Sequence, residues 1–514
     1  MSLIRAHAGA LVASIFVGIV IIAPQLAFIG GLGPAYQGIY LLNTDAELHY
    51  VARMQEAVQG GGIGNPFVAE FRHNVPSGFY SYSEEIVSLP ARILPIPIPT
   101  LNLFYKFLLP ALLALLVYAL IFRLTASRSW STVASITLVL GSTALNLSTA
   151  LRVLRLDLWY EQFLLFSRPI NPIFSLIIFF VFLHLLMSAE RMRSWVWFVA
   201  LGAVAGSAWY LYIYLGTTIF ALLGISAGVN LIYKKIRIAL QYLTALGIGT
   251  LIGIPGILSI ASIPQHPYYE LFVGPIGLVH TRMPYVHMPW LVVTGLFLWW
   301  WYHHKDHPHA LPLLSLLLTS FAVVNQQVLT GLSLHPGHYL TYFAIPMYIV
   351  VLAVLGYEYF KTRSGFAERA FQYAFCAYVI LAAAFIQYSS YVHWAPIVET
   401  EQRYAPVLAW LREHTPEGSV VMANQRLSEL IAAYTADDVM WEVHANSYLM
   451  PQSRWDFTPE NALAAENFCT FIKQYRLDYA VRDASDPEWS ALDGEPCLRP
   501  MAELDGFTIY EAGK

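Results

Sequence analysis

Residues 8–29 read AGALVASIFVGIVIIAPQLAFI and contain no charged side chain. A helix that crosses a bilayer needs about 20 largely uncharged residues, because its backbone polar groups must be bonded within the segment. The stretch is also longer than the apolar core of about 7 to 15 residues in a cleaved secretory signal. We therefore predict a retained membrane anchor.

The rest of the chain has the same character. The 514 residues are 57% hydrophobic and 12% charged, whereas a typical soluble protein is about 25% charged. One aqueous core cannot bury so many apolar residues. We predict a polytopic α-helical membrane protein with about eleven spans, of which ten follow the anchor, at residues 101–122, 130–150, 169–187, 195–210, 212–233, 238–261, 288–302, 308–325, 339–359 and 370–391.

The distribution of lysine and arginine predicts the orientation, because short cytoplasmic loops retain these residues. An N-terminus in the cytoplasm makes every short inward loop basic, through Arg123, Arg128, Arg191, Arg193, Lys234, Lys235, Arg237, Lys305, Lys361, Arg363 and Arg369. An odd number of spans then exports the C-terminus. We interpret the chain as a multi-pass protein of the bacterial cytoplasmic (inner) membrane, with its C-terminal domain on the periplasmic or extracellular side. The net charge of −4 does not favour a nucleic-acid partner.

Two long segments are expected outside the bilayer. Residues 1–392 are predicted to form a transmembrane module that includes an exported loop at 30–100, and residues 393–514 a small α/β domain. In the loop, a helix is expected at 45–59, ended by three glycines. In the tail, we expect helices at 401–414, 426–434 and 459–476, and strands at 419–423, 438–441, 479–482 and 507–511. Cys469 and Cys497 both fall in the tail, and their spacing leaves a disulfide open.

The most informative motif lies just beyond the first span, where residues 43–53 read NTDAELHYVAR. Asp45 and Glu47 place two carboxylates at the start of the predicted helix, next to the membrane surface. A carboxylate in the first turn of a helix also stabilises it through the helix dipole, by about 0.3 to 1 kcal/mol. The motif alone does not separate a structural role from a catalytic one.

The order of these features resembles that of the GT-C superfamily of membrane glycosyltransferases. The shared layout is a first span, an acidic motif at Asp45 and Glu47, a long exported loop, about eleven spans and an exported C-terminal domain. The superfamily includes protein O-mannosyltransferases, aminoarabinose transferases of lipid A and oligosaccharyltransferases. The resemblance implies that Asp45 is the catalytic base or a metal ligand. Many members have adjacent acidic residues, whereas Ala46 separates the two here, so either carboxylate could be the base.

A lipid-linked sugar donor carries a phosphate at the membrane interface, and arginine and histidine side chains donate hydrogen bonds to phosphate. Our candidates for this role lie in three exported connections and are Arg168, Arg282 and His338. Arg168 has an ordinary alternative, because an interfacial arginine often extends toward lipid head groups for solvation alone.

Other polar residues of the exported segments are candidates for contact with the acceptor, namely His49, Arg53, His73, Tyr80 and His335. The resemblance is compatible with a divalent metal ion. The residues themselves predict no metal site, because His335 and His338 are three apart and no third ligand has a recognisable spacing. The adjacent Glu84 and Glu85 are expected to point in different directions on any regular element.

We therefore predict transfer of a sugar from a polyprenyl-phosphate donor to a glycan, lipid or protein acceptor at the outer face of the membrane, with inversion. One alternative is a polymerase or ligase that uses a diphosphate-linked glycan. Another is a non-enzymatic glycolipid transporter or flippase, for which ionisable residues near the middle of the spans are expected. Most charges of the chain fall in loops, which favours chemistry at the interface.

Overall fold

The structure is a computed structural model, and it describes the chain except for residues 1–4, 43–44, 61–63, 73–81, 158–161, 193, 364, 443–448, 457, 465–467 and 514. The chain divides into two compact units. The first, which we call the helical unit, comprises Met1–Pro24, Phe104–Ala261 and Gly277–Val392. The second, which we call the mixed unit, comprises Gln25–Leu103, Ser262–Ile276 and His393–Lys514.

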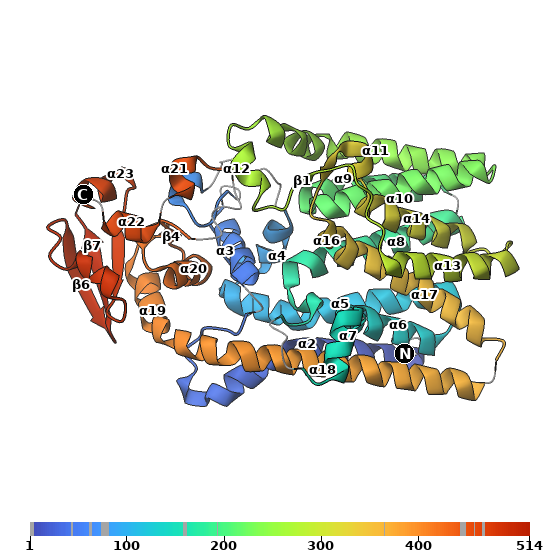
Figure 1. The fold of residues 1–514 in the computed structure, drawn as a ribbon, viewed down its shortest axis with the longest axis horizontal. Coiled ribbons are helices and arrows are strands. Elements are labelled where there is room, and N and C mark those ends of the chain that lie inside the picture. Colours follow the sequence, from blue (N-terminus) through green and yellow to red (C-terminus); the bar gives the residue numbers. More distant parts are fainter. Residues whose placement is uncertain are drawn as a thin grey trace. The chain divides into compact units, whose positions relative to one another are not determined.

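Each predicted span contains a helix, so the chain is a polytopic helical membrane protein, as predicted (Figure 1). Within the described residues, seven helices are long and apolar enough to cross a membrane, and they occupy Ala8–Ala35, Ile98–Thr125, Pro169–Met192, Ile213–Ile232, Ile236–Gln265, Pro336–Phe360 and part of Gly365–His414. The other predicted spans contain shorter helices, which are α6 (Arg128–Gly141), α9 (Trp195–Leu211), α13 (Met288–His303) and α14 (Ala310–Val324).

The apolar run predicted as one span at 130–150 is two helices, so that predicted extent is wrong. Helix α6 ends at Gly141, and α7 (Leu147–Leu154) starts a separate helix. The side chain of Asn146 accepts a hydrogen bond of 3.0 Å from the Ser148 N–H, which caps the start of α7. Hydropathy is continuous across the break, and the cap is what begins the new helix.

Two helices of the helical unit approach closely through glycines. A Cβ atom added to Gly202 of α9 would lie 2.7 Å from the Ala245 carbonyl oxygen of α11 (Ile236–Ser262). One turn later, a Cβ atom on Gly206 would lie 2.7 Å from the Gly249 carbonyl oxygen. Small residues four apart allow the backbones of membrane helices to touch. Any larger residue at either position would push the two helices apart.

The mixed unit contains a five-stranded sheet with the order β4-β3-β5-β7-β6. Strand β3 (Val420–Met422) is parallel to β4 (Asp438–Val439) and to β5 (Tyr479–Asp483), whereas β7 (Phe507–Ala512) is antiparallel to its neighbours. Four of these strands match the predicted ones. The core beside the sheet includes Met422, Ile472 and Trp489, all at most 1% exposed. The small α/β domain predicted from the sequence is therefore present.

The fifth strand, β6 (Leu498–Leu504), was not expected from the sequence. It contains Pro500, which cannot donate a ladder hydrogen bond and is confined to edge strands or bulges. The structure places β6 at the edge of the sheet, with a register shift between Pro500 and Ala502. Most of its side chains are exposed, so it lacks the buried alternation that identifies a strand.

The predicted helices of the tail are also present. They are α19 (Ala405–His414), which follows a short 3-10 turn at Gln402–Tyr404, and α20 (Gln425–Tyr434). The helix predicted at 459–476 contains α22 (Pro459–Leu463) and α23 (Phe468–Gln474), with residues 465–467 outside the described part of the chain.

Residues 30–100 belong to the same compact unit as the tail. The Gln402 side chain donates to the Ile39 carbonyl oxygen at 2.9 Å and accepts from the Gln37 N–H at 2.9 Å. Helix α3 (Asp45–Gln59) has the predicted bounds, and it packs against α4 (Tyr82–Ile93) and α20. The predicted division into a transmembrane module at 1–392 and a domain at 393–514 concerns which segments lie in the bilayer. That division stays a prediction.

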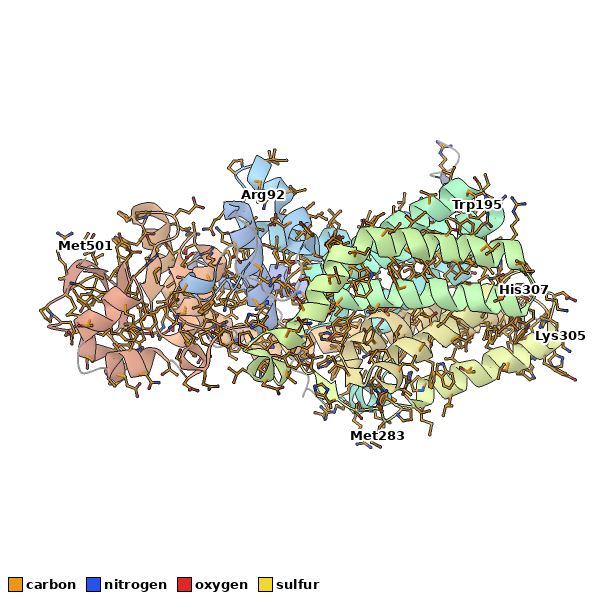
Figure 2. The ribbon with its side chains drawn as sticks, turned by 90° about the horizontal axis from the view of Figure 1, so that it is seen from above. Arg92, Trp195, Met283, Lys305, His307 and Met501 are labelled. Carbon is orange, nitrogen blue, oxygen red and sulfur yellow. A yellow bond between two sulfur atoms is a disulfide. The ribbon has the colours of Figure 1, made fainter. Side chains whose placement is uncertain are left out.

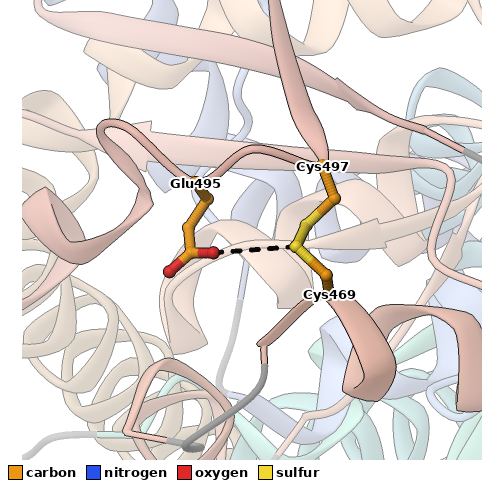
Figure 3. A group of neighbouring side chains, drawn as sticks. All are labelled: Cys469, Glu495 and Cys497. Carbon is orange, nitrogen blue, oxygen red and sulfur yellow. Dashed lines mark hydrogen bonds between the residues drawn. A yellow bond between two sulfur atoms is a disulfide. The ribbon is translucent and has the colours of Figure 1, made fainter.

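Cys469 and Cys497 form a disulfide (Figure 3). Cys469 lies in α23, and Cys497 directly precedes β6. The two are 28 residues apart. Closing a loop of this length lowers the entropy of the unfolded chain and so destabilises it by about 3 to 4 kcal/mol. The disulfide therefore fixes the unpredicted edge strand to the helix beside it.

Replacing both cysteines, Cys469→Ser with Cys497→Ser, is expected to lower the free energy of unfolding of the C-terminal domain by about 2 to 4 kcal/mol. Thermal unfolding of the purified full chain in detergent measures this. The free Cys376, changed to serine, is the control and should leave the transition unchanged. Equal transitions for the double variant and the control would contradict a stabilising disulfide.

A buried carboxyl precedes strand β4. Asp437 is 2% exposed, and its Oδ1 accepts a hydrogen bond of 2.7 Å from the Thr415 hydroxyl. Burial raises the pKa of Asp437 from its usual value to about 6, although the hydrogen bonds from Thr415 and Thr435 oppose the shift. The folded chain therefore binds this proton more tightly than the unfolded chain between about pH 4 and pH 6.

The raised pKa of Asp437 predicts how stability depends on pH. The protonated carboxyl contributes about 3 kcal/mol to the free energy of unfolding at low pH, and this contribution is lost as the pH rises through 6. Asp437→Asn keeps an acceptor for Thr415 and removes the titration. The variant should be more stable than the parent at pH 7.5, with a much smaller gain at pH 4.5. A gain in unfolding temperature that is equal at both pH values would contradict the prediction.

Candidate active site

Arg168 lies at the entry to a membrane-spanning helix. Its backbone is extended, with φ −91° and ψ 114°, and a π-helical turn, η4 (Pro169–Phe174), follows and leads into α8 (Ser175–Met192). Proline at the first position of a helical turn is favoured, because its ring fixes φ near the helical value. The chain thus changes direction at Arg168. The sequence predicted that this residue lies at the start of the span.

A second π-helical turn carries the partner of Arg168. Helix α16 (Pro336–Tyr339), the turn η6 (Leu340–Ala344) and α17 (Ile345–Phe360) follow one another in the chain. The Arg168 Nη2 donates a hydrogen bond of 2.7 Å to the hydroxyl of Tyr342 in η6. Such turns alter the direction of side chains within a helix and are frequent at functional sites.

His338 joins the same group of side chains. A hydrogen bond of 3.1 Å links its Nδ1 to the Tyr212 hydroxyl. Its ring stacks on the ring of Tyr342 at 4.9 Å and on that of His335 at 4.5 Å, measured between centroids. Two of the three predicted phosphate ligands, Arg168 and His338, are therefore connected through Tyr342. We call these five residues the Arg168 cluster.

Arg282 makes other contacts. Its Nη1 donates to the carbonyl oxygens of Val328 at 3.1 Å and Leu329 at 3.0 Å, near the end of the short helix α15 (Gln327–Thr330). Cations stabilise the C-terminal ends of helices. These contacts are not made with the residues of the Arg168 cluster. Its predicted role toward phosphate stays a prediction, and the visible contacts are those of a helix cap.

Lys106 was missed in the sequence. It is 0% exposed, and its Nζ donates a hydrogen bond of 3.1 Å to the Ser167 carbonyl oxygen, directly before Arg168. The signal was present, because Lys106 interrupts the apolar run 101–122, and an ionisable residue within a span is by default a functional candidate. The tyrosines of the cluster gave a weaker signal. Tyr212 is the extended residue at the break between α9 and α10 (Ile213–Ile232).

Helix α3 of the mixed unit positions the predicted carboxylates. Glu47 is 1% exposed, and its Oε1 accepts a hydrogen bond of 2.8 Å from the Asn102 side chain. Asp45 is the first residue of α3, but its side chain lies outside the described residues, as do His73 and Tyr80. Glu47 is therefore a buried carboxylate that is held in one position, two residues from the predicted base.

The remaining charged residues of α3 also face partners inside this unit. The Arg53 Nε donates to Glu84 Oε1 at 2.8 Å, and both side chains are at most 10% exposed. Glu56 is 0% exposed and accepts a hydrogen bond of 2.9 Å from the Gly64 N–H. The His49 ring lies 5.4 Å from the Phe67 ring. Arg53 and His49 were predicted to contact the acceptor. Their contacts described here lie within the protein, and the role toward the acceptor stays a prediction.

A metal site requires several ligand atoms that lie close together. Within the described residues, one group of three potential ligands lies close together, Cys469, Glu495 and Cys497 (Figure 3). Its sulfur atoms are bonded to each other, and a disulfide offers no thiolate to a metal. The described residues around Glu47 and His338 supply no such group, so we derive no step through a metal ion.

Comparison with known proteins supports the architecture. No protein family model matches the chain, and no curated protein sequence does. Among solved structures, the Archaeoglobus fulgidus oligosaccharyltransferase without ligand has a TM-score of 0.51 and 11% identity, covering 93% of this chain and 70% of its own. The same enzyme with zinc and sulfate has a TM-score of 0.50 and 12% identity, covering 93% and 68%. ArnT from Cupriavidus metallidurans has a TM-score of 0.49 and 12% identity, covering 94% and 97%.

The chain thus has a polytopic membrane fold similar to that of the Archaeoglobus fulgidus oligosaccharyltransferase. The resemblance inferred from the order of spans, acidic motif, loop and tail is confirmed at the level of the fold.

The adjacent glutamates of α4 allow a matched test of the buried ion pair. Glu84→Gln is expected to destabilise the chain by about 3 kcal/mol, because it removes the carboxylate that pairs with the buried guanidinium group of Arg53. Glu85→Gln weakens the more exposed contact with Arg92 and should change stability by less than about 1 kcal/mol. Thermal unfolding in detergent compares the two. Similar losses for both variants would contradict the distinction.

Proposed function

We propose that this protein transfers a sugar from a polyprenyl-phosphate donor to an acceptor at the outer face of a bacterial cytoplasmic membrane. The observation that supports this most is the hydrogen bond between Arg168 and Tyr342. It brings together residues from the starts of two membrane-spanning segments, Pro169–Met192 and Pro336–Phe360. The GT-C fold is that of the Archaeoglobus oligosaccharyltransferase, which supports the reaction class.

In this proposal, the Arg168 cluster holds the phosphate of the donor. Negative charge grows on that phosphate as its bond to the sugar breaks, so fixed hydrogen-bond donors stabilise the transition state. A guanidinium group matches the geometry of phosphate oxygens. The Tyr342 hydroxyl accepts from Arg168 and keeps its own hydrogen for another acceptor, such as a phosphate oxygen. Lys106 fixes the backbone before Arg168 and thereby its direction.

The proposed chemical step is a single displacement at the anomeric carbon. The acceptor oxygen forms a bond to this carbon, the bond from the carbon to the phosphate oxygen breaks, and Asp45 takes the proton of the acceptor hydroxyl. The polyprenyl phosphate leaves with the bonding electrons, and the configuration inverts. Glu47 is the alternative base. Its buried hydrogen bond with Asn102 suits a positioning role, which holds the start of α3 in place.

A glycolipid flippase is the second candidate, and the buried Lys106 favours it. Transporters place ionisable residues within their spans, and Lys106 is such a residue. A polymerase or ligase that uses a diphosphate-linked glycan is a third candidate with the same architecture. A turnover experiment distinguishes both candidates from the main proposal, because it shows which donor is used and whether a transfer product forms.

The test is turnover of radiolabelled polyprenyl-phosphate sugars by the purified full chain, reconstituted in vesicles with a panel of acceptors. Asp45→Asn is expected to lower kcat by about 100- to 10,000-fold, because the base is lost. Arg168→Lys should lower kcat/KM by about 10- to 100-fold, because lysine cannot hold phosphate in the same two-point contact. Glu399→Gln and Arg412→Lys, both at exposed positions, are matched controls.

Several results would reject the proposal. Full activity of both Asp45→Asn and Glu47→Gln would remove the assigned base. Movement of labelled glycolipid across the vesicle, with no transfer product, would identify a flippase. Turnover of diphosphate-linked glycans alone would identify the polymerase or ligase.

A further inference from the structure

A groove of about 900 Å³ lies within the helical unit and is lined mainly by apolar side chains. Its walls come from α6, α13, α17 and α18 (Gly365–Glu401). Aromatic rings dominate the lining, including Trp130, Trp299, Trp300, Tyr359 and Phe371. None of the residues of the Arg168 cluster lines it.

This groove lies far from the Arg168 cluster. One continuous helical segment, Pro336–Phe360, carries His338 near its start and Tyr359 near its end. At a rise of 1.5 Å per residue, these two residues are about 30 Å apart along the helix, which is the thickness of the hydrocarbon layer. Figure 2 shows Lys305 and His307 at one end of the helical unit, the end with the loops that the charge distribution predicts to be cytoplasmic. Glu358 of the lining lies 3.7 Å from His307, so the groove reaches this end of the unit.

The end of the groove beside His307 carries a positive charge. Arg363 is exposed, and its guanidinium carbon lies 4.0 Å from the centre of the Tyr359 ring. The acidic side chain of the wall, Glu358, forms an ion pair with Lys361 and lies 3.7 Å from His307 Nε2. The carboxylate is thus neutralised within the protein, and Arg363 is left to attract an anion. Basic pockets between spans on the cytoplasmic side are suited to anionic lipid head groups.

A buried donor on the wall points to a second feature of the ligand. Trp300 is 3% exposed, and its Nε1–H has no acceptor within the described residues. A buried donor without an acceptor costs about 1 to 3 kcal/mol, and the hydrocarbon layer supplies no water to satisfy it. The neighbouring Trp130 is different, because its Nε1 donates to Glu368 at 2.7 Å. A ligand with a carbonyl oxygen below its head group would satisfy Trp300.

We propose that this groove binds an anionic glycerophospholipid. Its acyl chains lie along the aromatic walls, an ester carbonyl accepts from Trp300, and Arg363 pairs with the phosphate. A polyprenyl phosphate has the anionic group and the apolar chain but no carbonyl, so it lacks the acceptor that Trp300 requires. The proposed site is therefore separate from the donor site in both position and chemistry, and it does not depend on the proposed reaction.

Native mass spectrometry of the delipidated full chain in detergent tests this by titration with lipids. Phosphatidylglycerol should bind about tenfold more tightly than phosphatidylcholine with the same chains. The ether-linked form of phosphatidylglycerol, which lacks the ester carbonyls, should bind about three- to tenfold more weakly than the ester form. Undecaprenyl phosphate should not compete at this site.

Two variants with matched controls localise the binding. Arg363→Ala should reduce the affinity for phosphatidylglycerol to that for phosphatidylcholine, whereas Arg369→Ala, an exposed arginine outside the groove, should leave it unchanged. Leu352→Trp should block the groove, whereas Leu381→Trp, on an exposed position outside the lining, should not. Equal binding of both phospholipids, preference for undecaprenyl phosphate, or an unchanged Arg363→Ala variant would overturn the proposal.

Discussion

The helical unit depends on one constraint, which is that polar groups in a layer without water must find partners inside the protein. Helices satisfy the backbone, and buried side chains satisfy the rest. Gln387 of α18 donates to the carbonyl oxygens of Val20 at 3.2 Å and Ile21 at 3.1 Å, and accepts from the Leu164 N–H at 3.1 Å. Lipid provides little hydrophobic force between helices, so such contacts and the close glycine packing of α9 on α11 hold distant segments together.

The same constraint makes the partners of buried polar side chains informative about function. Lys106 is retained within a span although a charge there is unfavourable, and its contact with Ser167 fixes the residue before Arg168. Trp300 is the opposite case, because its buried donor has no acceptor among the residues that the structure describes, and its side chain lines the groove. A satisfied polar group stabilises the protein, whereas an unsatisfied one beside a cavity identifies the chemistry of a ligand.

The mixed unit uses buried ion pairs for a similar purpose. Arg53 with Glu84 and Arg426 with Glu401 are both charged pairs in which the carboxylate is almost fully buried. They fix α3 and α20, which pack against each other, so Glu47 is carried by a helix with a defined direction. Functional groups on rigid elements are held more accurately than groups on loops. The position of the acidic motif thus depends on the packing and ion pairs that hold α3, and not only on the charge of the motif.

Hydropathy, periodicity and capping are local properties of a sequence. They were therefore enough to predict the helical and apolar segments, the bounds of α3, and the positions of Arg168 and His338 near the starts of spans. The break after Gly141, the edge strand β6 and the contacts of Lys106, Tyr212 and Tyr342 could not be predicted in this way. They depend on tertiary packing, since the partner of a polar group is set by which distant segments lie together. Arg168 and Tyr342 are 174 residues apart, and only the packing of their helices makes them neighbours.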